Sequence, residues 1–126
     1  MKRPAIHARP GVWVVAAGAS AVLLGAFGAH ALRTVLDEQH MGLWHTAVEY
    51  HFWHALALAL AAGLGRGRGG RVASMAFAVG IVLFCGSLYA LALGAPRWAG
   101  IITPLGGLAF VTGWVALGLS LRMPAD

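Results

Sequence analysis

Three long stretches without Asp, Glu, Lys or Arg constrain this sequence more than any other feature. They cover residues 10–32, 72–96 and 98–121. A helix of roughly 20 residues crosses the hydrocarbon core of a bilayer and satisfies its own backbone hydrogen bonds there. Each stretch is therefore predicted to form a transmembrane helix.

The composition excludes most other classes of protein. Hydrophobic residues make up 60% of the chain and charged residues only 10%, whereas a soluble domain carries about 25% charged residues. The apolar excess also excludes a disordered chain, and the single cysteine, Cys85, excludes a disulfide framework or a cysteine zinc finger. Because the nine Lys and Arg residues flank the apolar stretches, we expect a lipid bilayer, and no nucleic acid, as partner.

The segment 44–64 carries His45, Glu49, His51 and His54 before an apolar run, and we interpret it as a further span. The predicted fold is all-α, a single domain (1–126) forming an integral membrane bundle of four transmembrane helices at about 11–32, 44–64, 72–95 and 101–121. A cleaved signal peptide is the alternative for the first span, but its apolar run is longer than the apolar core of a signal. The mixed segment 33–42 is predicted to form a short interfacial helix after the first span.

The distribution of basic residues predicts the orientation. Seven Lys and Arg residues lie in the two termini and the 65–71 connection, whereas the other two connections carry only Arg33 and Arg97. The positive-inside rule then places both termini in the cytoplasm. We expect Arg66, Arg68 and Arg71 to contact anionic lipid headgroups.

Small residues at helical spacing predict close helix packing, because lipid supplies no hydrophobic drive for helices to associate. Four tryptophans are expected at the membrane interfaces as an aromatic belt: Trp13, Trp44, Trp98 and Trp114. Four short spans enclose little interior of their own, so we expect a homo-oligomer or a subunit of a membrane complex. The glycines expected to pack are Gly25, Gly86, Gly94, Gly106, Gly107 and Gly113.

Ionisable residues within a span are candidate functional groups because they are costly in lipid. On a helical projection of 44–64, His51 and His54 share the small-residue side, whereas Glu49 lies about 140° from His54, on the side of Trp53, Leu56 and Leu60. Counting from the expected helix ends puts His54 level with Cys85 and Ser87. We therefore expect an outer-half pocket for a small ligand or a proton relay, lined by His30, Tyr50, His54, Ser87, Tyr89 and Thr103.

Several alternatives for these groups stay open. His51 and His54 are weak candidates for a metal, although no carboxylate-rich set or HExxH motif accompanies them. Buried histidines that only hydrogen-bond across helices explain the same pattern. No nucleophile elbow, phosphate loop or dinucleotide fingerprint is present, so we expect a non-enzymatic protein whose cofactor, if any, is unknown. A channel is disfavoured because no ring of charge would select an ion.

Four blocks of the sequence resemble one known family. They are GAFGAHALR (25–33), WHTAVEYHFWHALAL (44–58), LFCGSLYALAL (83–93) and GIITPLGGLAFVTGW (100–114). Together, and in this order, they closely resemble domain of unknown function (DUF) family 423, small four-helix proteins of bacterial inner membranes. The resemblance implies a multi-pass inner-membrane protein. The matched positions are His30, Glu49, Tyr50, His54, Gly86, Ser87, Tyr89, Thr103, Pro104, Gly106 and Gly107.

His51 and Cys85 depart from the family pattern, which has Gln and Ser there, so the resemblance does not support either as a shared ligand. Because the function of the family is not established, two hypotheses stand. The first is an inner-membrane protein with the His/Tyr/Ser pocket described above. The second is an accessory or assembly subunit of a larger complex, which uses the glycine stripes and the Trp53/Leu56/Leu60 face for contact.

Overall fold

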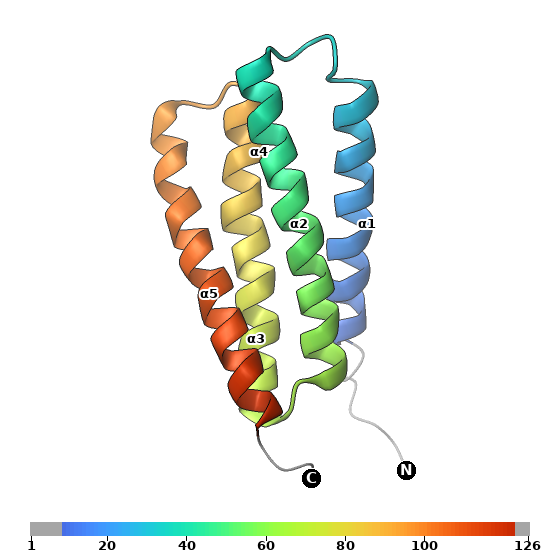
Figure 1. Ribbon diagram of the computed structural model, residues 1–126, viewed down its shortest axis with the longest axis vertical. Helices are drawn as coiled ribbons and strands as arrows, with labels where there is room; N and C mark the ends of the chain where they lie inside the picture. The colour runs from blue at the N-terminus through green and yellow to red at the C-terminus, as the bar shows by residue number, and fades with distance from the viewer. Residues whose placement is uncertain (1–8, 123–126) are drawn as a thin grey trace.

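A computed structural model describes residues 9–122, which form an all-helical bundle (Figure 1). The elements are α1 (Arg9–His30), α2 (Glu38–Leu64), α3 (Gly67–Gly80), a π-helical segment η2 (Ile81–Cys85), α4 (Gly86–Ala92), a 3-10 turn η3 (Arg97–Ile101) and α5 (Ile102–Leu121). Because α3, η2 and α4 run on without a break, the described chain makes four long helices. The predicted all-helical fold is confirmed.

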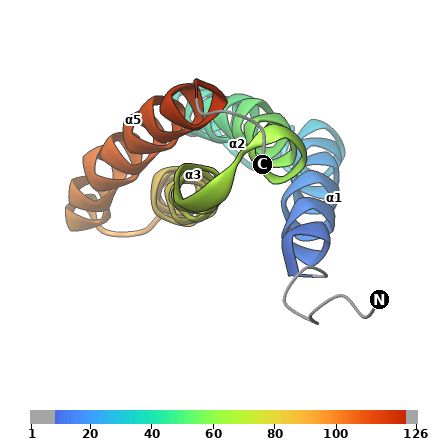
Figure 2. The same cartoon turned by 90° about the horizontal axis from the view of Figure 1, so that it is seen from below.

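The helices pack in chain order. α2 lies between α1 and the continuous α3–η2–α4 helix, and α5 packs chiefly on α3 and η2. Viewed from below, α1 and α5 lie at opposite edges of the bundle (Figure 2). Both ends of the described chain lie at the same end of the bundle (Figure 1).

Three helices are long and apolar enough to cross a membrane: Gly11–His30, Gly67–Ala92 and Arg97–Leu121. They match three of the predicted spans to within a few residues. α2 is longer, with 27 residues, but its histidines and Glu49 lower its apolar character. Within residues 9–122 there is no strand.

The start of α2 corrects the predicted interfacial helix. Residues 31–37 form turns, and the second half of the predicted segment 33–42 is instead the start of α2. Asp37 caps that helix, because its side chain accepts a hydrogen bond of 2.8 Å from the backbone N–H of His40. The cap starts α2 at Glu38, well before Trp44, where the sequence predicts the span to begin.

The connection between α2 and α3 is also shorter than predicted. Only Gly65 and Arg66 separate the two helices, so most of the basic segment predicted as a loop forms the first turn of α3. A Cβ on Gly65 would lie 2.7 Å from the Cα of Gly70, so the backbones meet directly. Ser120 of α5 holds this turn, since its hydroxyl donates to the Arg66 carbonyl at 3.0 Å and accepts from the Arg66 amide.

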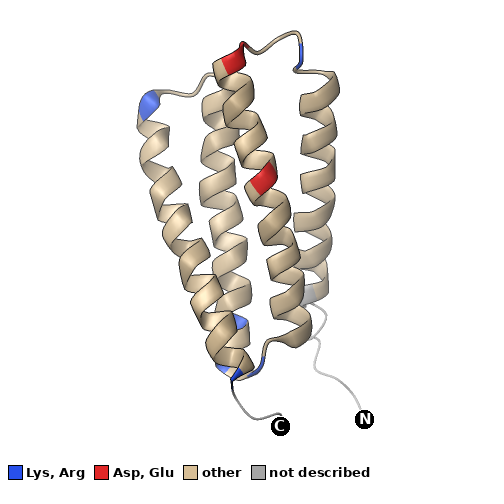
Figure 3. Cartoon of the chain, viewed as in Figure 1, with Lys and Arg blue, Asp and Glu red and all other residues tan. Residues whose placement is uncertain are grey.

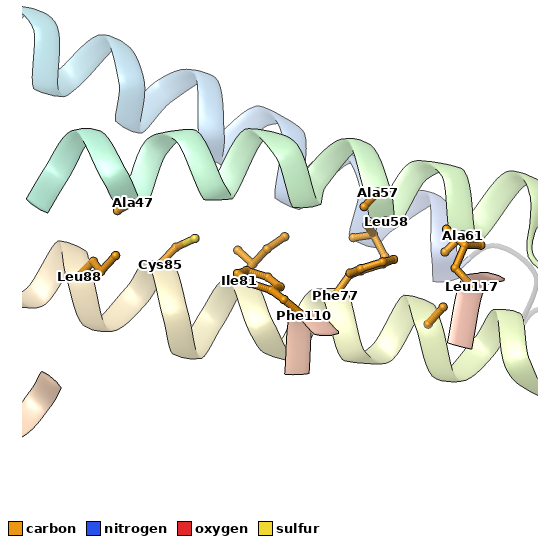
Figure 4. Packing of buried hydrophobic residues seen from close by; sticks show 11 residues of the cluster. Ala47, Ala57, Leu58, Ala61, Phe77, Ile81, Cys85, Leu88, Phe110 and Leu117 are labelled. Carbon is orange, nitrogen blue, oxygen red and sulfur yellow. The ribbon is translucent and has the colours of Figure 1, made fainter. Parts of the chain in front are cut away.

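The core lies along the seam between α2 and the α3–η2–α4 helix (Figure 4). Phe77 and Cys85 of the long helix are fully buried there, against Ala47 and Leu58 of α2. The π-helical segment falls in the middle of this seam. The outer faces carry large apolar side chains, as lipid-facing helices require.

Glycines allow α5 to approach the long helix closely. A Cβ on Gly106 would overlap the backbone nitrogen of Phe84, and one on Gly113 would lie 2.6 Å from the Phe77 ring. Gly25 faces Val48 of α2 at 3.4 Å, an ordinary contact.

Two of the predicted packing glycines have no neighbouring helix against them within residues 9–122. Gly86 and Gly94 have no atom within 4 Å of a Cβ placed on them. Gly94 instead follows the end of α4 with a φ of +103°, a conformation that favours glycine. Gly107 meets only the edge of the Phe84 ring, at 3.9 Å.

Candidate functional site

His51 links three helices in the middle of the bundle. Its Nε2 lies 3.0 Å from the hydroxyl of Ser20 on α1, and its Nδ1 lies 2.9 Å from the hydroxyl of Tyr89 on α4. Ser20 donates its own proton to the Ala17 carbonyl. Its oxygen therefore accepts from the Nε2–H of His51, and the Tyr89 hydroxyl donates to Nδ1. His51 is 3% exposed and has both ring nitrogens paired.

His54 joins α2 to α5. Its Nδ1 lies 2.8 Å from the Tyr50 carbonyl and its Nε2 lies 3.1 Å from the indole nitrogen of Trp114. A carbonyl only accepts and an indole N–H only donates, so the ring is neutral with its proton on Nδ1. The ring also stacks on Phe110, with 3.5 Å between centroids. These contacts leave His54 without an unused polar atom.

The residues of the predicted pocket form three separate contacts and do not line one common space. Tyr89 pairs with His51, and Tyr50 stacks near His54. The hydroxyls of Ser87 and Thr103 lie 2.5 Å apart between α4 and α5, and Ser87 donates to the Phe84 carbonyl. His30 is exposed at the end of α1. Within residues 9–122, every buried side-chain nitrogen and oxygen has a partner.

The level of His54 differs from the prediction because α2 begins earlier than expected. The sequence predicts His54 beside Cys85 and Ser87, but its aromatic neighbours include Phe77, Phe110 and Trp114. His54 lies about 24 Å along α2 from Glu38. Phe77 lies about 23 Å along the antiparallel long helix from its end at Ala92, so the two side chains are level.

The two weak metal candidates face different neighbours. His51 turns to α1 and α4, whereas His54 turns to α5, and both rings use both nitrogens in hydrogen bonds. In the described part of the chain, no three His, Cys, Asp or Glu side chains gather closely enough to hold a metal ion.

Two of the tryptophans expected at the membrane interface donate hydrogen bonds to other helices. Trp44 is 2% exposed and donates to the Leu24 carbonyl at 3.0 Å. It fits there because Gly28 has no side chain, and a Cβ at that position would lie 2.5 Å from the indole Cδ1. Trp114 is 47% exposed, and its indole N–H donates to His54.

Sequence reasoning missed Ser20 and Trp114 as the partners of the two histidines. The only available signal was that each carries a polar group within an apolar stretch. Both partners lie far from α2 along the chain, on α1 and α5, so local spacing does not reveal them.

Glu49 has a different environment from the histidines. It is exposed on α2, away from either end of that helix (Figure 3). Trp53, Leu56 and Leu60, which follow on the same face, are 52%, 64% and 46% exposed. Among residues 9–122, no side chain forms an ion pair or hydrogen bond with the Glu49 carboxylate.

The basic residues expected to meet lipid lie together at one end of the bundle. Arg66 precedes α3, and Arg68 and Arg71 are in its first turns, where all three are at least partly exposed. The α2–α3 connection lies at the end where both described termini lie (Figure 1), and Figure 3 shows basic residues there. Arg33, between α1 and α2, and Arg97, at the start of η3, belong to the connections at the opposite end.

Comparison with known sequences gives the family. Residues 24–107 match the family described as "Protein of unknown function (DUF423)". The chain belongs to the DUF423 family. The resemblance seen in the sequence is thereby confirmed. The DUF423 match covers α2, the long helix and the first part of α5, and so includes both buried histidines and Glu49.

Several relatives of this DUF423 protein are membrane proteins by name. The UPF0382 membrane protein YwdK of Bacillus subtilis is 41% identical over 101 residues, covering 77% of this chain and 82% of that protein. A UPF0382 membrane protein of Haemophilus influenzae is 40% identical over 82% of this chain and 86% of its own length. The UPF0382 inner membrane protein YgdD of Escherichia coli is 39% identical, covering 76% of each chain. No solved structure matches this chain.

Proposed function

We propose that this DUF423 protein is a non-enzymatic, four-span protein of the bacterial inner membrane that assembles with a second copy of itself through the outward face of α2. Three membrane-length helices and the names of the relatives support the membrane setting. α2 runs from the end where α1 stops to the end where α3 starts (Figure 1), which supports a fourth span. The excess of basic residues at the end that holds both termini favours a cytoplasmic position for that end.

The observation that carries the proposal is the outward position of Glu49. It lies about 16 Å from Glu38 along a helix of 27 residues. Ionisable groups within a span are costly and almost always face protein or water. An exposed, unpaired carboxylate at this depth therefore favours a protein surface that covers it.

A second copy supplies a suitable partner for this carboxylate. His45 is exposed one turn from Glu49 on the same face. Two copies in one membrane share an orientation, so a two-fold axis along the membrane normal sets the two faces against each other at equal depth. Glu49 of each copy then approaches His45 of the other, and Trp53 and Leu56 pack around the pair.

The buried histidines give less support to the alternative of a ligand pocket or proton relay. The chain from Tyr89 through His51 to Ser20 ends on the Ala17 carbonyl, which does not accept and pass on a proton. The hydrogen-bond partners of His54 are the Tyr50 carbonyl and the Trp114 indole, and neither group passes on a proton. These arrangements favour histidines that fix the helices in register.

Cysteine crosslinking in native membranes tests the assembly. Leu56→Cys places a thiol on the proposed face, and Leu119→Cys on α5 is the matched control. The two leucines are 64% and 55% exposed, and both lie roughly 27 Å from the end that carries the α1–α2 connection. The native Cys85 is buried and does not compete. We expect a crosslinked dimer with Leu56→Cys and none with Leu119→Cys.

Loss of the carboxylate tests the chemistry. Two Glu49–His45 contacts at about 1 kcal/mol each predict a roughly 30-fold weaker dimer for Glu49→Leu. Single-molecule counting in lipid vesicles over a range of protein densities would measure it. A monomeric wild-type protein, crosslinking at Leu119→Cys alone, or an unchanged dimer in Glu49→Leu would each overturn the proposal.

A further inference from the structure

An open cavity of about 690 Å³ lies beside the connection between α1 and α2. Its walls come from the end of α1, the turn that follows and the first two turns of α2. It contains none of the buried histidines. Its size falls within the range of small-molecule sites in proteins.

The lining of this cavity carries both signs of charge. Arg33, Asp37 and Glu38 are among its lining residues, and His45 lies further along α2. The backbone N–H and the side chain of His40 donate to Asp37 and lower the pKa of its carboxyl, so this carboxylate is ionised at neutral pH. Both hydrogen bonds go to Oδ1, which leaves Oδ2 and the Glu38 carboxylate for a ligand.

The remaining walls are apolar. Ala29, Leu36 and Met41 line the cavity beside the charged groups, and Leu36 and Met41 are half-buried. In the four-span arrangement proposed above, this end of the bundle lies at the outer headgroup region. A ligand with a charged head and an apolar stem would match both parts of the lining.

The charges discriminate among headgroups. A guanidinium binds a phosphate through paired hydrogen bonds. A primary ammonium donates up to three hydrogen bonds to carboxylates, whereas a quaternary ammonium has no N–H to donate and gains most from aromatic rings, and the lining has no Phe, Tyr or Trp. An anionic headgroup without an ammonium would be repelled by the two carboxylates.

We infer that this cavity binds a phospholipid headgroup that carries both a phosphate and a primary ammonium, of the phosphatidylethanolamine type. Arg33 holds the phosphate, and Asp37 and Glu38 hold the ammonium. The inference rests on the proposed four-span placement and not on the second copy.

Native mass spectrometry of the full chain tests this inference. The protein is released from vesicles of equal parts phosphatidylethanolamine, phosphatidylcholine and phosphatidylglycerol with matched acyl chains. We expect retained phosphatidylethanolamine to exceed phosphatidylcholine roughly tenfold, the sum of two exposed ion-pair contacts. Glu38→Gln should lower this ratio to roughly threefold, because the Asp37 contact remains. Arg33→Gln should weaken retention of both lipids and leave their ratio unchanged, because both carry the phosphate. Arg97→Gln, which removes the other arginine at this end of the bundle, should leave it unchanged.

Three results would overturn the inference: equal retention of phosphatidylcholine, preference for phosphatidylglycerol, or an unchanged ratio in Glu38→Gln. Soluble phosphoethanolamine distinguishes a free compound from a lipid. Displacement of the lipid by this compound at micromolar concentration would overturn the lipid assignment, whereas resistance would support it.

Labelling with a membrane-impermeant thiol reagent separates this inference from the placement on which it rests. Thr34→Cys, exposed in the α1–α2 connection, should react from outside spheroplasts. External labelling without a headgroup preference refutes the cavity inference alone. Labelling only after lysis refutes the proposed orientation, in which this end of the bundle lies at the outer surface.

Discussion

Replacing Gly106 with alanine is expected to destabilise the bundle by about 2 kcal/mol, whereas the same change at Gly107 is tolerated. A Cβ on Gly106 would overlap the backbone nitrogen of Phe84 and lie 2.6 Å from its Cα. A Cβ on Gly107 would meet only the Phe84 ring, at 3.9 Å, an ordinary van der Waals contact. The two neighbouring positions form a matched pair.

The magnitude follows from opposing terms. Overpacking costs about 1 to 3 kcal/mol, and contact with backbone favours the upper end because no rotamer relieves it. Alanine is a better helix former than glycine by up to about 1 kcal/mol. This gain offsets part of the overpacking cost in Gly106→Ala, and it stabilises the folded state in Gly107→Ala. The difference between the two variants is therefore expected to be about 3 kcal/mol.

Equilibrium unfolding in mixed micelles of mild detergent and dodecyl sulfate, followed by circular dichroism, would measure this difference. Helical content of the folded state serves as the control that both variants insert and fold. Equal stabilities within about 0.5 kcal/mol would refute the reasoning, because they would mean that α5 does not approach η2 closely at this point.

Two further predictions concern hydrogen bonds. Tyr89→Phe removes the donor to Nδ1 of His51 and is expected to cost about 1 kcal/mol in the same assay, whereas Ser74→Ala, which loses only a bond within its own helix, should change little. Asp37 has a lowered pKa in the folded state, chiefly because the His40 backbone N–H donates to it. The cap is therefore fully present above the ordinary aspartate pKa and is lost as the pH falls through the lowered one. Protection of the His40 amide from hydrogen exchange should fall in acid, and Asp37→Ala should abolish both the protection and its pH dependence.

Long, uncharged stretches predict the helices well because the bilayer leaves few other structures for such a chain. The first predicted span, 11–32, is offset only slightly from α1, which runs from Arg9 to His30. The second is predicted to begin too late, because an N-cap such as Asp37 can start a helix well before its apolar part. Because α2 begins six residues earlier than predicted, His54 lies about 9 Å further from the start of its helix than the sequence predicts.

The site could be predicted only in part. The helical projection put His51 and His54 on the packed side and Glu49 on the other, and the structure agrees. Partners on other helices could not be predicted, because they depend on helix ends and on how each helix is rotated. Trp114 illustrates the limit, since its sequence context suggests an interface residue and its indole instead binds His54.

The π-helical segment Ile81–Cys85 makes the protein sensitive to changes in chain length. A π turn holds one residue more than an α turn, so the residues beyond it are rotated by about 100° compared with an uninterrupted α-helix. Phe77 and Tyr89 would lie about 120° apart on an uninterrupted α-helix, and this offset turns both toward α2, where they meet His54 and His51. Deleting a single residue there, such as the exposed Val82, would leave an apolar helix of sufficient length to span the bilayer. The same deletion would turn Tyr89 away from His51. Lipid-facing positions thus accept many apolar replacements, whereas the number of residues between Phe77 and Tyr89 is fixed.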